Sequence, residues 1–391
     1  MKKILSNNIV ILVFAVVLGI LLGKYADYPL VLTTVQTIKS ISSQIIFFLV
    51  PLIVLAFVSS AVTSLKNNAT KLFLVSFLVA YLSSESAAFF SLVLSYSVVP
   101  LLHCDPIANA KELPELFFTF KIPPLTDVIS ALFLAIFIGL GVAWTKASVA
   151  SRLLGEFREI MLVVVKRVLQ PALPFYIFSN FYLMSWQGSI DSLLIFLPVI
   201  GILIVAQLVW IVLLYSFATV YSRKNAFEIL SHYAPAYFTA LGTMSSAATL
   251  GVALDCARKS KVLRHDVSGF SIPLFSNIHL CGATLTETFF LSVVSLLLYG
   301  HLPEASTFVL FIVLLGIFAV GSPGVPGSTA FASAGIVSSV LGFEDNGIAL
   351  FLALFALQDS FGTSCNILGD GALSLIIQRF NDKNETKSIN S

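Results

Sequence analysis

The sequence predicts an all-α membrane protein with eight transmembrane helices and two re-entrant helical hairpins. Of its 391 residues, 58% are hydrophobic and only 11% are charged, whereas a soluble domain usually carries about 25% charged residues. The apolar runs are long enough for helices rather than barrel strands. Polar and helix-breaking residues interrupt the later runs, and such residues are costly in hydrocarbon unless they line a cavity.

The first six apolar segments are uninterrupted enough to be simple spans. The first follows Lys2 and Lys3 and has no small-residue cleavage site behind it, so it is expected to stay as an uncleaved helix rather than a signal peptide. The predicted spans are 8–23, 42–65, 70–101, 116–145, 157–187 and 190–221.

The last four segments differ because each contains a polar interruption. Segment 226–257 is broken by Pro235 and by the polar run Thr243–Thr249, and segment 307–342 is broken by the Gly/Pro run Gly321–Ser328. The remaining two segments, 267–299 and 345–377, carry polar side chains within long apolar stretches. Segments 226–257 and 307–342 are predicted to form hairpins, each of which enters and leaves the membrane on the same side.

The distribution of positive charge favours this topology. With two hairpins, both termini are cytoplasmic and most of the 22 Lys and Arg residues fall inside, as the positive-inside rule requires. Those left outside are Lys24, Lys39, Lys111 and Lys121. If 226–257 crossed the membrane instead, the cluster Arg258–Arg264 would move outside. The first hairpin therefore opens from the cytoplasm and the second from the exterior.

These four segments form an internal repeat. A hairpin followed by a polar-interrupted span (226–299) is repeated from the opposite face (307–377). Inverted repeats with broken helices that meet near the midplane are typical of secondary transporters.

One face of the last span carries an unusual set of polar groups. Spacings of 4, 3 and 4 place four side chains on one helical stripe: Asp359, Thr363, Asn366 and Asp370. Gly362 and Gly369 leave room there for a ligand or for close backbone approach. Neighbour hydrogen bonds would satisfy single polar groups, but two buried carboxylates favour a bound metal ion or a substrate ammonium group as partner.

The penultimate span carries a weaker stripe, formed by Asn277, Cys281, Thr284 and Thr288. His279 points elsewhere if the helix is regular, as a packing residue, and turns inward if the helix unwinds. Glu287 is expected to face another subunit or water. In the third span, Glu85 shares a face with Tyr81 and Ser84, and a structural hydrogen bond is as good an interpretation as a functional one.

At this point the pattern resembles the dicarboxylate/amino acid:cation symporters, the family of glutamate transporter homologues, over nearly the whole chain. The stretches that carry the resemblance are Val50–Ile53, the serine-rich run Thr243–Leu250, the tip Gly324–Gly327, and the motif from Asp359 to Asp370. The last of these is the most specific.

The resemblance implies an elevator-type transporter that forms a homotrimer in the bacterial inner membrane, with Na⁺ or H⁺ as coupling ion and no other cofactor. Residues 1–225 would form mainly the scaffold, with the third and sixth spans partly in the transport domain. Residues 226–378 would form the transport core, and residues 379–391 a disordered cytoplasmic tail.

The resemblance also assigns roles to residues. Asp359 would hold the substrate amine, while hairpin backbone would hold its carboxylate. The substrate-binding residues would be Ser245, Ser246, Gly324, Val325, Asp359, Gly362, Thr363 and Asn366. The sodium-binding residues would be Asn366, Asp370, Asn277, His279, Ala319, Val320 and Ser322.

The chain departs from the family pattern at two places. His279 and Cys281 stand where the family has an asparagine and a sodium-coordinating aspartate, which suggests an altered cation or proton site involving Tyr81, Ser84, Glu85 and Cys281. We expect Glu85 to restore the missing carboxylate, or Glu85 and His279 to make the site proton-linked. Gly362 stands where carriers of acidic amino acids have an arginine, so bidentate recognition of a second carboxylate is lost.

The predicted function is therefore cation-coupled symport of a small neutral amino acid of the size of serine, alanine or threonine. The alternatives are a proton- or sodium-coupled dicarboxylate or glutamate symporter, and a transport-impaired sensor or channel-like relative. The sequence has no GxSxG or HExxH motif and no histidine–carboxylate cluster with metal spacing, which argues against an enzyme. No feature predicts nucleic-acid binding.

Overall fold

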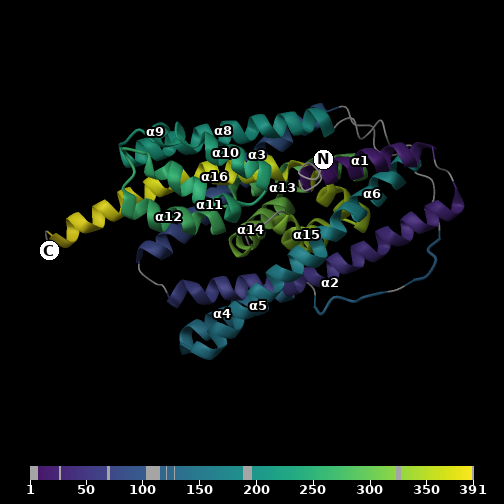
Figure 1. The fold of residues 1–391 in the computed structure, drawn as a ribbon, viewed down its shortest axis with the longest axis horizontal. Coiled ribbons are helices and arrows are strands. Elements are labelled where there is room, and N and C mark those ends of the chain that lie inside the picture. Colours follow the sequence, from purple (N-terminus) through teal and green to yellow (C-terminus); the bar gives the residue numbers. More distant parts are fainter. Residues whose placement is uncertain are drawn as a thin grey trace.

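The computed structural model describes residues 8–25, 28–67, 71–102, 115–119, 121–126, 128–187, 196–322 and 327–389. Over these residues every regular element is a helix, and no strand is present. The chain folds into an elongated bundle whose helices run mostly along its long axis (Figure 1).

Residues before 225 form long apolar helices, with one bent exception. A stretch of π-helix, η2 (Val165–Leu169), joins α5 and α6, and the two arms bend by 44° near Pro171 and Pro174, which remove backbone donors. The elements are α1 (Asn8–Tyr25), α2 (Pro29–Asn67), α3 (Lys71–Val98), η1 (Val99–Leu101), α4 (Val128–Thr145), α5 (Ser148–Val164), η2, α6 (Gln170–Trp186) and α8 (Phe196–Ser222).

Residues after 225 form shorter helices around one long helix. They are α9 (Phe227–Leu230), α10 (Ala234–Thr243), α11 (Ser246–Arg258), α12 (His265–Ile278), α13 (Cys281–Tyr299), α14 (Ala305–Gly321), α15 (Ser328–Leu341) and α16 (Asp345–Ile389). The pairs α10–α11 and α14–α15 pack against each other, and α16 packs against α8, α10, α12 and α13. In Figure 1 the yellow helix α16 runs through this half of the bundle.

The protein core lies around α12, α13 and α16. Helix α13 and the part of α16 up to Gln378 are almost completely buried and about half of α12 is buried, whereas α3 and α8 expose apolar side chains such as Leu78, Leu82, Leu208 and Val212. In a bilayer, apolar exposure on an outer helix is favourable because lipid replaces water around it. The polar groups of α13 and α16 therefore lie where other helices, and not lipid, surround them.

In the part of the chain that the structure describes, five helical segments are long and apolar enough to cross a membrane, with α12 and α13 counted as one, and the bent α5–α6 pair would make a sixth. The fold is thus all-helical with several candidate spans, and the count of eight stays a prediction. The four arms of the predicted hairpins contain 10, 13, 17 and 14 residues, and about 20 residues are needed to span the hydrocarbon core.

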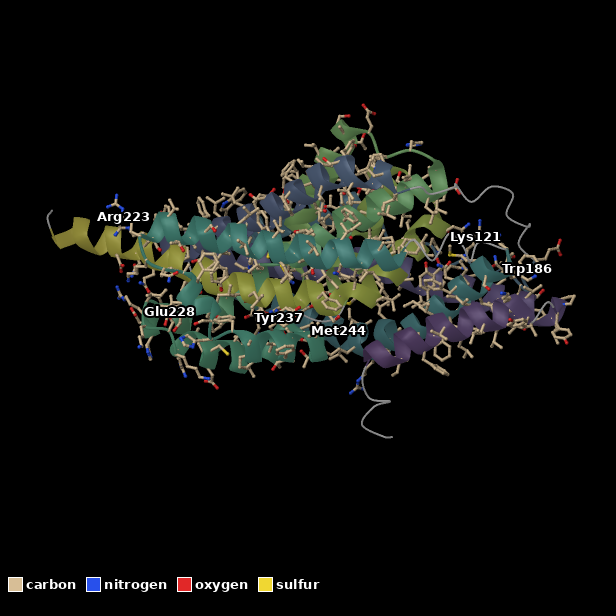
Figure 2. All side chains as sticks on the ribbon, turned by 90° about the horizontal axis from the view of Figure 1, so that it is seen from above. Lys121, Trp186, Arg223, Glu228, Tyr237 and Met244 are labelled. Atoms are coloured by element: carbon tan, nitrogen blue, oxygen red, sulfur yellow. The ribbon has the colours of Figure 1, made fainter. Side chains whose placement is uncertain are left out.

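The first hairpin reverses its direction inside the bundle, as its short arms require. Figure 2 shows Arg223 and Glu228 at one end of the molecule and Lys121 and Trp186 at the other, with Met244 between them. Met244 ends α10 in the left-handed conformation (φ 52°) and Ser245 begins the return helix. The chain therefore reverses partway along the bundle.

Several predicted boundaries were wrong. Helix α2 begins at Pro29 rather than 42, because a proline suits the first helical turn. In the segment predicted to begin at 116, the described residues before Val128 are not helical. Pro123 and Pro124 have no backbone N–H to donate to a helical hydrogen bond. The backbone N–H groups of Phe117 and Ile122 instead donate to the side chains of Thr37 and Gln44 on α2.

The predicted disordered tail from 379 was also wrong in most of its length, since α16 continues to Ile389. Contacts with the loop before α12 hold the beginning of this extension. The Gln378 side chain accepts from the backbone N–H of Arg264 at 2.6 Å, and the Arg264 guanidinium pairs with Asp382 at 2.9 Å.

Candidate functional site

The broken span α12–α13 organises the site. His279 (φ −105°, ψ 110°) and Leu280 (φ −129°, ψ 40°) leave the helical conformation, so the chain unwinds for two residues between the helices. The sequence had left open whether His279 points outward or inward, and this break turns it inward. The break also separates Asn277 from Cys281, so the stripe predicted across them does not form.

The backbone N–H groups that lose their helical partners at this break donate to side chains of two other helices. The first N–H groups of a helix have no partner within it. Here the Leu280 N–H donates to Ser84 Oγ at 3.1 Å, and Asn366 Oδ1 accepts from Gly282 at 2.7 Å and from Ala283 at 3.3 Å. Thr284 Oγ1 also donates to the Ser84 carbonyl at 2.8 Å. Helices α3, α13 and α16 are thereby joined at one point.

His279 lies at the centre of this junction and is completely buried. Its Nδ1 lies 3.0 Å from Asp370 Oδ1, and its Nε2 lies 3.0 Å from Ser83 Oγ. The other carboxylate oxygen of Asp370 accepts from Ser276 Oγ at 3.3 Å. The sequence predicted a mobile cation for Asp370, whereas the structure places a fixed protein group beside it.

Two glycines allow these close approaches. A Cβ added at Gly369 would lie 2.5 Å from His279 Cε1, and one added at Gly282 would lie 2.4 Å from the Gly362 carbonyl oxygen. Helices α13 and α16 therefore cross closely where Gly282 meets the Gly362 backbone. A Cβ added at Gly362 itself would make only ordinary contacts at 3.5 Å or more.

Asp359 lies three turns before Asp370 on the same helix and has different surroundings. It is 5% exposed. Its Oδ2 accepts from the Gly327 backbone N–H at 2.7 Å, just before α15, and its Oδ1 accepts from Thr363 Oγ1 at 3.4 Å. No Lys, Arg or His within the described residues forms an ion pair with it.

The predicted tip residues of the first hairpin cap its second helix. Ser245 Oγ accepts from the Ala248 N–H at 3.3 Å and so serves as the N-cap of α11, and Ser246 is buried in its first turn. Gly324 and Val325, predicted for the second tip, lie outside the described residues.

The remaining predicted cation ligands have local partners. Asn277 Nδ2 donates to the Pro273 carbonyl at 2.8 Å. Ala319 and Val320 lie in the last turn of α14, where the Ala319 carbonyl accepts from the Ser322 N–H at 3.1 Å and Ser322 Oγ donates to the Phe318 carbonyl. Among the described residues, no three His, Cys, Asp or Glu side chains gather as a transition metal would require.

The expectation that Glu85 restores a carboxylate at Cys281 was wrong. Adjacent residues of a helix point about 100° apart, so Ser84 faces α13 while Glu85 faces α14. The Glu85 carboxylate lies directly against Gly316, and Tyr81 Oη donates to the Val313 carbonyl at 3.3 Å. Cys281 Sγ instead contacts the Cys365 carbonyl oxygen on α16 at 3.9 Å.

Glu287 was expected to face water or another subunit, but it is completely buried. Its Oε2 accepts from Ser333 Oγ on α15 at 2.6 Å, and its Oε1 has no partner within the described chain. Sequence reasoning missed Ser83, Ser276 and Ser333 because single serines are common in membrane helices.

Comparison with known proteins identifies the family of this chain. The model of the sodium:dicarboxylate symporter family matches residues 9–380. Excitatory amino acid transporter 3 of Homo sapiens is 29% identical over 165 residues, which cover 41% of this chain and 30% of that protein. Neutral amino acid transporter B(0) of Homo sapiens is 27% identical over 171 residues, covering 43% and 31%.

A third relative is a putative sodium-dependent excitatory amino acid transporter of Caenorhabditis elegans, 28% identical over 165 residues, with 41% and 32% covered. The aligned region thus spans about a third of the length of these relatives. The family match, in contrast, covers nearly the whole chain. The protein belongs to the sodium:dicarboxylate symporter family.

Proposed function

We propose that this protein is a cation-coupled symporter of a small neutral amino acid. Membership of a symporter family already makes it a transporter and not an enzyme. The names of the relatives include both acidic and neutral amino acid transporters, so the choice between these substrates depends on the residues of this chain.

The observation that carries the proposal is the environment of Asp359. A buried carboxylate without a cationic partner is costly, and within the described residues Asp359 accepts hydrogen bonds only from an N–H and a hydroxyl. The α-ammonium group of an amino acid would complete this environment. The contact with Gly327 would also link substrate binding to the tip of the second hairpin.

The neutral preference rests on the charges around that carboxylate. From α10 to Gln378 on α16, the helices contain a single Lys or Arg, Arg258 in the last turn of α11. The substrate α-carboxylate can use the N–H groups at a hairpin helix N-terminus. A second carboxylate would have no guanidinium to meet it, because Gly362 provides no side chain.

Transport itself is proposed to follow the elevator scheme. Residues 226–378, together with parts of the third and sixth spans, would move as one body against the rest of 1–225 within a homotrimer, with both termini in the cytoplasm. Two observations support the division: the short hairpin arms belong to the C-terminal part, and the most buried helices, α13 and α16, lie there.

Uptake into proteoliposomes tests the proposal. We expect saturable uptake of alanine or serine driven by a cation gradient, and weak competition by aspartate. Asp359→Asn should weaken substrate affinity about 30-fold or more, the effect of losing one partner of a buried charge pair. Asp255→Asn, at an exposed position on α11, is the matched control and should transport normally.

Two outcomes would contradict this function. Strong aspartate uptake without competition by neutral amino acids would refute the neutral preference. Transport spared by Asp359→Asn would favour a dicarboxylate carrier without amine recognition. Gly362→Arg gives a converse test, since its Cβ meets no clash, and it should shift selectivity towards aspartate.

A further inference from the structure

The inference concerns Asp370, the second buried carboxylate of α16, and it rests on the proposed coupled transport. A carboxylate inside a membrane protein needs a positive partner or several hydrogen-bond donors. For a coupled transporter the obvious partner is a travelling cation. The contacts of Asp370 point to a different one.

Each oxygen of this carboxylate is engaged by a protein group. The imidazole of His279 occupies Oδ1 at 3.0 Å and the Ser276 hydroxyl occupies Oδ2 at 3.3 Å. Neither His279 nor Asp370 exposes any surface. Whether the imidazole is neutral or charged, Nδ1 can donate to Asp370 while Nε2 pairs with Ser83. The pairing therefore holds in either form.

Among the described residues, the side chains beside Asp370 do not offer a hard cation a set of free oxygen ligands. Na⁺, like other hard cations, favours carboxylate, carbonyl and water oxygens. The Asn366 amide oxygen already accepts two backbone N–H groups. The side chain of Cys281 presents sulfur, and its distance of 3.3 Å from a Cβ at Gly369 shows that it lines the same space.

The space beside Asp370 is also filled. His279 Cε1 lies so close to the α16 backbone that a single methyl group at Gly369 would overlap it at 2.5 Å. We propose that the imidazole of His279 takes the cation position beside Asp370, so that this chain binds no sodium ion there. Any coupling sodium must then bind elsewhere in the protein.

Sodium binding to the purified protein, measured with ²²Na⁺ and without substrate, tests the proposal. The wild-type protein and Asp370→Asn should bind the same number of ions per chain. The variant His279→Asn/Cys281→Asp, which removes the imidazole and supplies oxygen ligands, should bind about one more. Adding Asp370→Asn to this variant is the matched control and should remove the gain.

Loss of one bound sodium ion on Asp370→Asn in the wild-type background would overturn the proposal. So would the absence of any gain in a folded double variant. If the variants do not fold, histidine-selective ¹⁵N NMR of the wild-type protein decides, with five histidines to resolve. The buried imidazole signal should be unchanged between saturating NaCl and choline chloride, and a sodium-dependent shift would overturn the proposal. A protein inactive in every uptake assay would refute the transport function but not this result.

Discussion

Replacing Gly369 by alanine should destabilise the protein through His279. The new Cβ would lie 2.5 Å from Cε1 and 3.3 Å from Nδ1 of the imidazole, whereas carbon atoms pack best at about 3.5–4.0 Å. The ring must therefore move by about 1 Å, which distorts its 3.0 Å contacts with Asp370 and Ser83 and weakens at least one of them.

The expected magnitude combines two effects. Overpacking a core costs about 1–3 kcal/mol, and leaving a buried polar group unsatisfied costs about 1–3 kcal/mol more. Part of this is offset because alanine is the better helix former by about 1 kcal/mol. The free energy of unfolding should fall by roughly 1–5 kcal/mol, measured as a lower midpoint of thermal unfolding followed by tryptophan fluorescence.

A matched control and a double-mutant cycle make the test specific. Gly269→Ala, on α12 with no atom within 4 Å of its added Cβ, should be neutral or slightly stabilising. In a His279→Ala background, Gly369→Ala should lose most of its effect, because residues in contact show non-additive changes. An equal loss of stability in both backgrounds would refute the placement of the imidazole against Gly369.

Two further predictions concern α3 and the end of the bundle near Arg223. Ser84→Ala removes the acceptor of the buried Leu280 N–H and should lower the free energy of unfolding by about 1–3 kcal/mol. Ser86→Ala, at an exposed position of the same helix, should change thermal stability little. Equal effects of the two substitutions would contradict the role of Ser84 as acceptor for Leu280. Hydrogen bonds to Glu228 from Ser260, the Lys261 N–H and His232 hold its pKa below the ordinary 4.5, although its partial burial alone would raise that pKa. A lowered native pKa stabilises the fold above the unfolded value and is lost as pH falls through the native one, so Glu228→Gln should be less stable at neutral pH and should match wild type under acid conditions; a difference that persists in acid would contradict this account.

The polar stripe on the last span could be predicted from the sequence because a regular helix fixes it. Spacings of 4, 3 and 4 place Asp359, Thr363, Asn366 and Asp370 on one face in any α-helix, and α16 is regular over this range. The same reasoning failed for Asn277 and Cys281, because the helix breaks between them and the period is lost. Periodicity identifies a face only where the backbone stays helical.

Partners across helices could not be predicted for a related reason. Hydrophobicity places α3 in the membrane, but it does not fix the rotation of α3 about its axis. A turn of about 100° separates Ser84 from Glu85, and this decides which of them meets the broken span. Glu85 attracts attention as the only carboxylate of α3, yet the serines on the neighbouring face, Ser83 and Ser84, form the contacts with His279 and Leu280.

The two aspartates of α16 therefore have separate roles in the proposals above. Eleven residues apart on one helix, they are about 16 Å apart along its axis, so a single cation cannot serve both. Asp370 has a protein partner that moves with it, whereas Asp359 depends on what enters beside Gly327. A zwitterionic substrate adds no net charge to the buried site, while an acidic one adds a negative charge next to Asp359. Because His279 pairs with Asp370 and not with Asp359, an acidic substrate would meet no positive side chain of this pair, and we expect the neutral substrate to be favoured.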